Sequence, residues 1–257
     1  MNSLWCRPWS RTAAISTGLV LAFTPLSGCG SQKAAPTPAA SSDAENGSRV
    51  PASTTPTVIA APAIPDLVAD ERRLALADFS PFPEGSHEWS EEGAILRTTG
   101  KPKGYLYTKE SFGDFLLKYD VRYPSASGAD IETLKENSGV LVYITGEHKV
   151  WPLSMEIQGK YIDLGSVKEN GGAAPATQTF NRDLQRKMIK PPHEWNSVEV
   201  LSEGGALTVK LNGEEVTKAE PNFLSSGPIG LQAEGFPVEI ANLRVLPKPE
   251  AGGAVQP

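Results

Sequence analysis

The stretch DFLLKYDVRY, residues 114–123, decides the fold class of this chain. Apolar and polar side chains alternate along it, which is the period of a β-strand that buries one face. The apolar side chains are those of Phe115, Leu117, Tyr119 and Val121, whereas Lys118, Asp120 and Arg122 point the other way. We therefore expect a strand that packs one face into a core and turns a charged face outward.

Segments of the same kind recur on both sides of this stretch. We expect further strands at residues 138–144, 153–158, 196–202, 206–211, 214–217, 229–233 and 238–246. Turn signals separate them, and the strongest is Asn212-Gly213, the pair most typical of a tight hairpin. One segment, residues 181–190, suits a short helix. Strands at such short spacing predict an all-β domain, either a sandwich or a barrel.

Composition excludes several classes of protein. The 257 residues carry 24 basic and 30 acidic side chains, for a net charge of −6. Nucleic-acid binders usually present a basic face, so no nucleic-acid partner is expected. The two cysteines, Cys6 and Cys29, lie near the amino terminus and offer no disulfide framework. The three histidines lack the spacing of a zinc site, so we expect no cofactor, although a divalent cation held by oxygen ligands stays open.

The amino-terminal residues have the pattern of an export signal. Two arginines precede an apolar run at residues 13–26 that is too short to span a bilayer permanently. The run leads into LSGC at residues 26–29, which resembles the bacterial lipobox, where the cysteine is acylated. We therefore expect Cys29 to anchor the exported protein in a lipid bilayer. Gly30, in place of an aspartate, favours the outer membrane, with the protein facing the periplasm or the cell surface.

The chain divides into four segments by composition. After the signal peptide at residues 1–28, residues 29–65 are rich in proline, alanine, serine and threonine, which predicts a disordered tether. Residues 66–247 form the expected folded domain, and residues 248–257 form a disordered tail. We expect the protein to be a monomer.

Several motifs in the folded segment resemble those of the 3-keto-disaccharide (3-keto-glucoside) hydrolase family. They follow one another in order from Asp78 to Leu246: GYLYTKESFGDF at 104–115, NSGV at 137–140, KVWPLSMEIQ at 149–158, EWN at 194–196, LNG at 211–213, GLQAEG at 230–235 and NLR at 242–244. The chain departs from the family pattern at Glu239-Ile240-Ala241, and it carries Glu234 where some members have a histidine. The resemblance implies a concanavalin-like jelly roll of two antiparallel sheets with a carbohydrate on one face.

The resemblance also implies cleavage of glycosides that carry a ketone at the third ring carbon. Such a ketone makes the proton on the second carbon acidic, so a base can remove it while the leaving group departs, and water then adds to the resulting enone. Glu156 is the first candidate for this base, because strand parity points its carboxylate away from the core. An ordinary solvated carboxylate is the competing interpretation.

The other candidates are residues that could bind the sugar. We expect Asp120 and Arg122 on the same face as Glu156, where the arginine would lower the pKa of a neighbouring carboxylate. The remaining substrate-binding candidates are Asn137, Trp151, Gln158, Gln232 and Glu234. A tryptophan before a proline, such as Trp151, is more often a core or edge plug than a sugar-binding surface, and Asn137 is also consistent with a turn. His148 lies near the predicted site at a position that the family pattern does not mark.

Two further functions compete with the hydrolase interpretation. A carbohydrate-binding, lectin-like lipoprotein would use the same sandwich without cleaving its ligand. A laminarinase-type glucanase needs E-[IL]-D-x-x-E on one strand, because two close carboxylates act as nucleophile and acid. Residues 156–161 read EIQGKY, so Gln158 replaces the middle acid and Tyr161 replaces the second glutamate, which excludes the glucanase.

Overall fold

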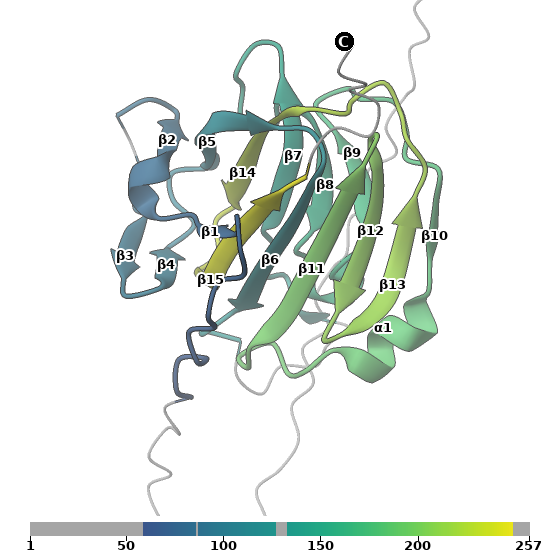
Figure 1. Ribbon diagram of the computed structural model, residues 1–257. Helices are drawn as coiled ribbons and strands as arrows, with labels where there is room; N and C mark the ends of the chain where they lie inside the picture. Colours follow the sequence, from purple (N-terminus) through teal and green to yellow (C-terminus); the bar gives the residue numbers. More distant parts are fainter. Residues whose placement is uncertain (1–58, 86, 127–132, 249–257) are drawn as a thin grey trace, which may run out of the picture. The chain divides into compact units, whose positions relative to one another are not determined.

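The computed structural model describes residues 59–85, 87–126 and 133–248. Cys29, the export signal, most of the expected tether and nearly all of the tail lie outside these ranges. Within them the chain forms two antiparallel sheets that pack face to face (Figure 1). No helix in the described ranges combines the length and apolar character needed to cross a membrane.

The larger sheet, sheet A, has eight strands in one path and a ninth at its side. Its order is β10 (Gln178–Phe180), β13 (Glu214–Ala219), β12 (Ala206–Leu211), β11 (Asn196–Glu203), β6 (Phe115–Arg122), β15 (Val238–Pro247), β4 (Ile95–Thr98) and β3 (Ser90–Glu92), and β1 (Arg72–Arg73) pairs with β15. Strand β6 therefore lies near the middle of sheet A, which explains its regular alternation of buried and half-buried residues.

The smaller sheet, sheet B, has six strands. Its order is β2 (Phe79–Phe82), β5 (Gly104–Phe112), β14 (Gly227–Ala233), β7 (Gly139–Thr145), β8 (Leu153–Gln158) and β9 (Val167–Asn170). The helical elements of the described residues are α1 (Arg182–Met188) and two short 3-10 turns, Leu76–Asp78 and Tyr161–Asp163. The expectation of an all-β, two-sheet jelly-roll sandwich is confirmed.

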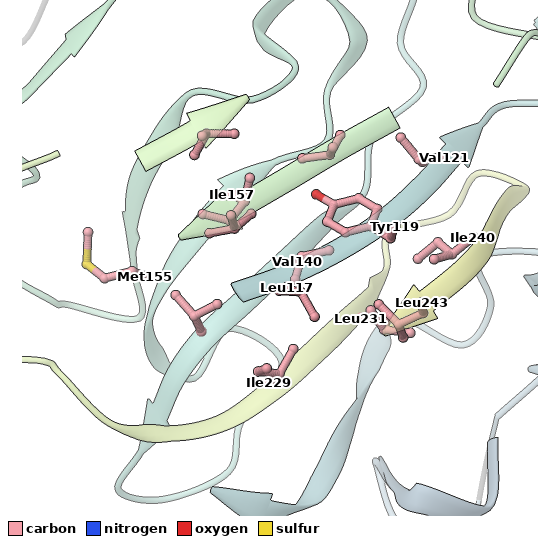
Figure 2. Close-up of a cluster of buried hydrophobic side chains, with 14 of the residues drawn as sticks. Leu117, Tyr119, Val121, Val140, Met155, Ile157, Ile229, Leu231, Ile240 and Leu243 are labelled. Atoms are coloured by element: carbon pink, nitrogen blue, oxygen red, sulfur yellow. The ribbon is translucent and has the colours of Figure 1, made fainter. Parts of the chain in front are cut away.

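The core fills the space between the two sheets (Figure 2). Leu117, Tyr119 and Val121 of β6 meet Val140 of β7 and Ile157 of β8, and all five are buried. Burial of such side chains is worth about 1.5–3 kcal/mol each, so this layer is the main source of stability. Because successive side chains of a strand alternate between its two faces, burial of these residues makes their neighbours along each strand face outward.

The hairpins form where the sequence predicted them. Asn212 (φ 50°) and Gly213 (φ 93°) join β12 to β13, and positive φ at both positions is the backbone of a type I′ turn. The short helix α1 also forms, and the side chain of Asn181 caps it by accepting a hydrogen bond from the Leu184 amide at 3.0 Å.

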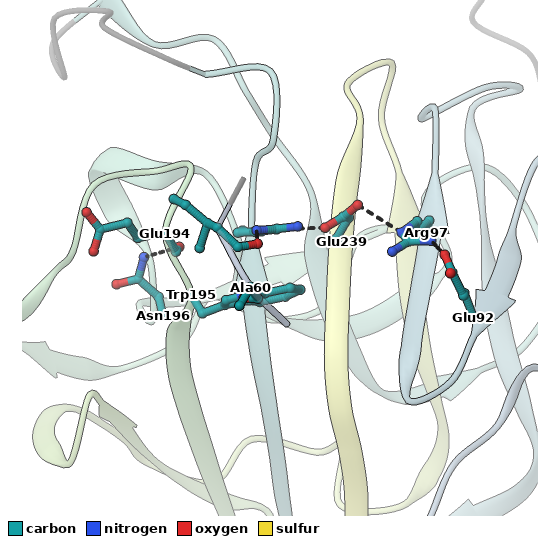
Figure 3. Close-up of polar contacts among 9 residues, drawn as sticks. Ala60, Glu92, Arg97, Glu194, Trp195, Asn196 and Glu239 are labelled. Atoms are coloured by element: carbon teal, nitrogen blue, oxygen red, sulfur yellow. Dashed lines mark hydrogen bonds and ion pairs between the residues drawn. The ribbon is translucent and has the colours of Figure 1, made fainter. Parts of the chain in front are cut away.

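The ordered chain begins earlier than the predicted domain boundary at residue 66. Ile59, Ala60 and Ala63 lie against the outer face of sheet A, where their carbonyl groups accept side-chain hydrogen bonds from Arg122 (3.1 Å), Trp195 (3.1 Å) and Asn242 (3.0 Å), respectively. Figure 3 shows Ala60 above the Trp195 ring. Residues 59–63, assigned to the tether by composition, are thus part of the sandwich surface.

Candidate active site on the outer face of sheet B

Pairing between neighbouring strands places four polar and aromatic positions side by side on the outer face of sheet B. Glu156 of β8 lies opposite Leu141 of β7, and Gln158 lies opposite Gly139. Across the sheet, Gln232 of β14 lies opposite Tyr105 of β5. Residues two apart on one strand share a face, so this register collects the side chains over the centre of the sheet.

Glu156 is the most perturbed carboxyl group of this face. It is 8% exposed, although it points away from the core. Burial, and to a smaller extent the negative charge of Glu234, raise the pKa of Glu156 to about 7, against the opposing effects of Lys168 and of a hydrogen bond from Gln232. A carboxyl group with this pKa exchanges a proton readily near neutral pH, as a general base or acid must.

The absence of a side chain at Gly139 makes room for this carboxyl group. A Cβ atom at that position would overlap the Gln232 Oε1 atom and lie 2.7 Å from Glu156 Oε1. Gln232 Nε2 approaches Glu156 Oε2 at 3.5 Å, a long hydrogen bond. The Gln232 Oε1 atom is buried and has no partner among the described residues, so it can accept a hydrogen bond from a ligand.

Gln158 has a different environment from the one its parity predicted. Its side chain is on the outer face but is only 6% exposed. Its Oε1 atom accepts a 2.7 Å hydrogen bond from the backbone amide of Lys160, so that atom fixes the turn after β8. The oxygen of Gln158 is therefore already used by the fold.

Glu234 forms a second polar group at the end of β14. Its two carboxylate oxygens accept hydrogen bonds from Asn137 Nδ2 and from Trp151 Nε1, the latter at 3.1 Å. All three residues line an open cavity of about 370 Å³. Trp151 is 50% exposed, so the interpretation of this ring as a core plug is wrong.

The sequence did not predict the contact between His148 and Tyr105. Tyr105 Oη and His148 Nδ1 are 2.6 Å apart, and the His148 ring lies 4.3 Å from the Tyr107 ring. Burial raises the pKa of Tyr105. Since β14 separates β5 from β7, the loop between β7 and β8 must reach back across β14 to make these contacts. The alternating tyrosines of residues 104–108 were the available signal for an aromatic group here.

The expectation that Asp120 and Arg122 share a face with Glu156 is wrong. Both lie on the outer face of sheet A, because β6 belongs to that sheet. Asp120 Oδ2 accepts a 2.8 Å hydrogen bond from Asn242, and Arg122 forms a 2.7 Å ion pair with Glu239 and lies 4.4 Å from the Trp195 ring centre. Alternation gave the outward direction correctly but carries no information on which sheet a strand joins.

This placement also reverses the expected electrostatics of Glu156. An arginine nearby would have lowered its pKa, whereas burial and Glu234 raise it. In the described part of the chain, no three His, Cys, Asp or Glu side chains gather closely enough to hold a metal ion. The site is therefore built from two carboxylates, amides and aromatic rings.

Fold and site together define a β-sandwich with a buried, perturbed carboxylate on one outer face. Residues 75–246 match the family model described as the 3-keto-alpha-glucoside-1,2-lyase-like domain, and the chain belongs to this family. Glu156, Asn137, Trp151, Gln232 and Glu234 all fall within the matched region.

Similar solved structures share the sandwich. A candidate glycosyl hydrolase from Parabacteroides distasonis ATCC 8503 has 18% identity and a TM-score of 0.50 over 67% of this chain and 89% of its own. A second candidate from the same organism has 24% identity and a TM-score of 0.44 over 61% and 88%. The carbohydrate-binding module CBM66 from Bacillus subtilis has 12% identity and a TM-score of 0.44 over 65% and 94%. No curated protein matches the chain.

Proposed function

We propose that this protein cleaves 3-keto-glycosides, with Glu156 as the base. The observation that carries the proposal is the carboxyl group of Glu156, which is buried beside the Gln232 amide, whose oxygen is unpaired, and has a pKa raised to about 7. Membership of a family described by a lyase acting on 3-keto-α-glucosides supports the same substrate class. A base of this pKa is matched to the weakly acidic proton next to a ketone.

The first step is an elimination. The Glu156 carboxylate takes the proton from the second ring carbon, the electron pair of that bond forms the double bond to the anomeric carbon, and the bond to the leaving oxygen breaks. The leaving group takes up a proton, and the sugar is released as an enone conjugated to its ketone. This step alone is a 1,2-lyase reaction. Addition of water, with its hydroxyl at the anomeric carbon and its proton at the second carbon, completes a hydrolysis.

Other residues bind the sugar in this proposal. Gln232 Oε1 and Asn137 Oδ1 are both buried and have no hydrogen-bond partner among the described residues, so sugar hydroxyls can donate to them. Glu234 keeps the proton affinity of Glu156 high through its charge. The exposed ring of Trp151 offers an apolar surface to a sugar ring.

The test compares a chromogenic 3-keto-α-glucoside with its unoxidised parent, using the purified full-length protein. We expect release of the chromophore from the keto form alone, with loss in Glu156→Gln. Asp120→Asn is the matched control, since it makes the same kind of change on the opposite face and should retain activity. Enone absorbance distinguishes elimination from complete hydrolysis. Equal cleavage of both glycosides would show that no ketone is needed.

A carbohydrate-binding protein without catalysis is the second candidate. The half-exposed Trp151 and the unpaired Asn137 oxygen favour it, because both can bind a sugar without any proton transfer. Calorimetric binding of the keto-glycoside, with no product after prolonged incubation, would establish this function in place of the enzyme.

We further propose that the protein is exported and held on a membrane by an acylated Cys29. The LSGC motif at residues 26–29 supports this, and it lies outside the described residues. Cys29→Ala should move the protein from the membrane fraction into the soluble fraction. Retention of that variant in the membrane would contradict the anchor.

A further inference from the structure

The cavity beside Glu234 is lined by three lysines. Lys103 lies directly before β5, Lys135 lies two residues before Asn137, and Lys160 follows the end of β8. Three separate segments of the chain thus contribute a lysine to the lining of one cavity of about 370 Å³. This is a local excess of positive charge in a chain with a net charge of −6.

These ammonium groups are available to a ligand. Within residues 59–85, 87–126 and 133–248, no acidic side chain lies within ion-pair distance of Lys103, Lys135 or Lys160. Glu234 is the acidic residue in the cavity wall, and both of its oxygens accept hydrogen bonds from Asn137 and Trp151. The three lysines therefore outnumber the one carboxylate, whose oxygens are already engaged.

The other residues that line the cavity are mainly apolar and can pack against a ring of a bound ligand. Trp151 is half-exposed, and Phe236 and Leu134 complete the apolar part of the lining. The Asn137 Oδ1 atom is buried without a partner among the described residues, so it can accept a hydrogen bond from a hydroxyl or amide of a bound group. Apolar plates and one hydrogen-bond acceptor, together with ammonium groups, are the features that bind a ring with an anionic substituent.

We propose that this cavity is the leaving-group subsite of the reaction proposed above, and that it takes an aglycone carrying a carboxylate or another fixed negative charge. The proposal rests on the proposed function. Glu156 itself is not in the cavity wall, but Gln232 Nε2 lies 3.5 Å from Glu156 Oε2, and Glu234, two residues after Gln232, is part of that wall. A sugar whose second carbon lies at Glu156 would therefore extend its neighbouring group into the cavity.

The experiment uses two 3-keto-α-glucosides whose aglycones differ by one charge, 4-carboxyphenyl and 4-carboxamidophenyl. The full-length protein should cleave the carboxylate with a kcat/KM about three- to tenfold higher at low salt, since an exposed ion pair contributes on the order of 1.5- to 5-fold each. Salt screens such contacts, so the ratio should approach one in 0.5 M sodium chloride. Lys103→Gln, Lys135→Gln and Lys160→Gln combined should bring the ratio near one at any salt concentration.

Lys210→Gln is the matched control, because it removes an exposed lysine from β12 in sheet A and should leave the ratio unchanged. A ratio near one for the unaltered protein at low salt overturns the subsite proposal while leaving the enzyme intact. If neither compound is cleaved, the proposed function fails instead. In that case, the affinities of both compounds for the Glu156→Gln variant, measured by calorimetry, test whether the cavity prefers an anionic aglycone. Equal affinities would overturn the subsite proposal.

Discussion

The two outer faces of the sandwich each carry a carboxylate of low exposure, and the two carboxylates have opposite surroundings. On sheet A, the Glu239 side chain is 12% exposed and lies between Arg97 at 2.9 Å and Arg122 at 2.7 Å (Figure 3). On sheet B, Glu156 is 8% exposed, has no ion pair among the described residues, and has a pKa raised to about 7.

The difference in surroundings gives the two carboxyl groups different properties. The Glu239 carboxylate, between two guanidinium groups, links three strands, β4, β15 and β6. A buried carboxyl group without such partners sits near its protonation midpoint at neutral pH, a state that stability alone does not favour. The sheet A face is also covered in part by residues 59–63, which accept hydrogen bonds from Trp195 and Asn242.

The largest effect on catalysis is expected from Glu156→Gln. Loss of the base should lower kcat for the 3-keto-glucoside by about 10²- to 10⁴-fold, the range of general base catalysis. The melting temperature should not fall, because an amide replaces a poorly solvated carboxyl group. Steady-state kinetics and calorimetry measure both effects. If the variant kept the wild-type kcat, Glu156 would not be the base, and catalysis could no longer be assigned to the sheet B face.

A smaller effect is expected from Gly139→Ala. Its Cβ atom would overlap Gln232 and press on Glu156, so both side chains must shift. Because the backbone of Gly139 is not in the left-handed region, alanine is compatible with the strand itself. We expect kcat to fall about tenfold or more, since displacement of a catalytic group by 1 Å costs up to about 10²-fold. Far-UV circular dichroism should be unchanged. An unaltered kcat would show that this close packing is unimportant.

The pH dependence should report the same carboxyl group. Below its pKa of about 7, Glu156 is protonated and cannot accept a proton, so kcat/KM should fall towards tenfold per pH unit on the acidic side. Stability should change in the opposite direction. The folded-state pKa lies above the ordinary value of 4.5, so the stabilising contribution is present below pH 4.5 and is lost as pH rises through 7.

The difference amounts to roughly 3 kcal/mol between those pH limits, since each unit of pKa corresponds to 1.36 kcal/mol. Glu156→Gln is the control, because it cannot titrate. Its unfolding free energy, measured in denaturant from pH 4 to pH 8, should lack this loss. Parallel pH profiles for the two proteins would refute the raised pKa.

The smallest effect on activity is expected from Glu239→Gln on sheet A. The variant leaves Arg97 and the nearly buried Arg122 without their shared counter-ion, which should cost about 2–4 kcal/mol of stability. The melting temperature should fall by roughly 5–15 °C while kcat changes less than twofold. Glu215→Gln, which breaks an exposed pair with Lys218, is the matched control and should melt close to the unaltered protein. A large fall in kcat at full stability would mean that the sheet A face takes part in catalysis.

Much of the fold could be predicted from the sequence because its strongest signals are local. The segment 153–158 became β8 with the predicted bounds, and the Asn212-Gly213 turn formed between β12 and β13. Short strands such as β3 (Ser90–Glu92) and β10 (Gln178–Phe180) were missed. Three residues contain too little alternation to indicate a strand, and pairing with neighbours decides their conformation.

The site was predictable in part, for a physical reason. Parity placed Glu156 and Gln158 outside the core, and the structure brings Asn137, Gln232 and Glu234 to the same face. Parity did not place Trp151, whose exposed ring donates a hydrogen bond to Glu234. Parity does not tell which sheet a strand joins, which is why Asp120 and Arg122 were misplaced. Parity also gives no information on loop conformation, so the contact between His148 and Tyr105 could not be predicted from the sequence.

Residues 59–63 dock on the outer face of sheet A and so distinguish the two outer faces of the sandwich. We call the sheet A face the back and the sheet B face the front. On the back, the carbonyl groups of Ile59 and Ala60 accept hydrogen bonds from Arg122 and Trp195, respectively. Glu156 lies on the front, on the other side of two sheets packed roughly 10 Å apart. A substrate bound at Glu156, as proposed above, would therefore lie on the face that residues 59–63 do not cover.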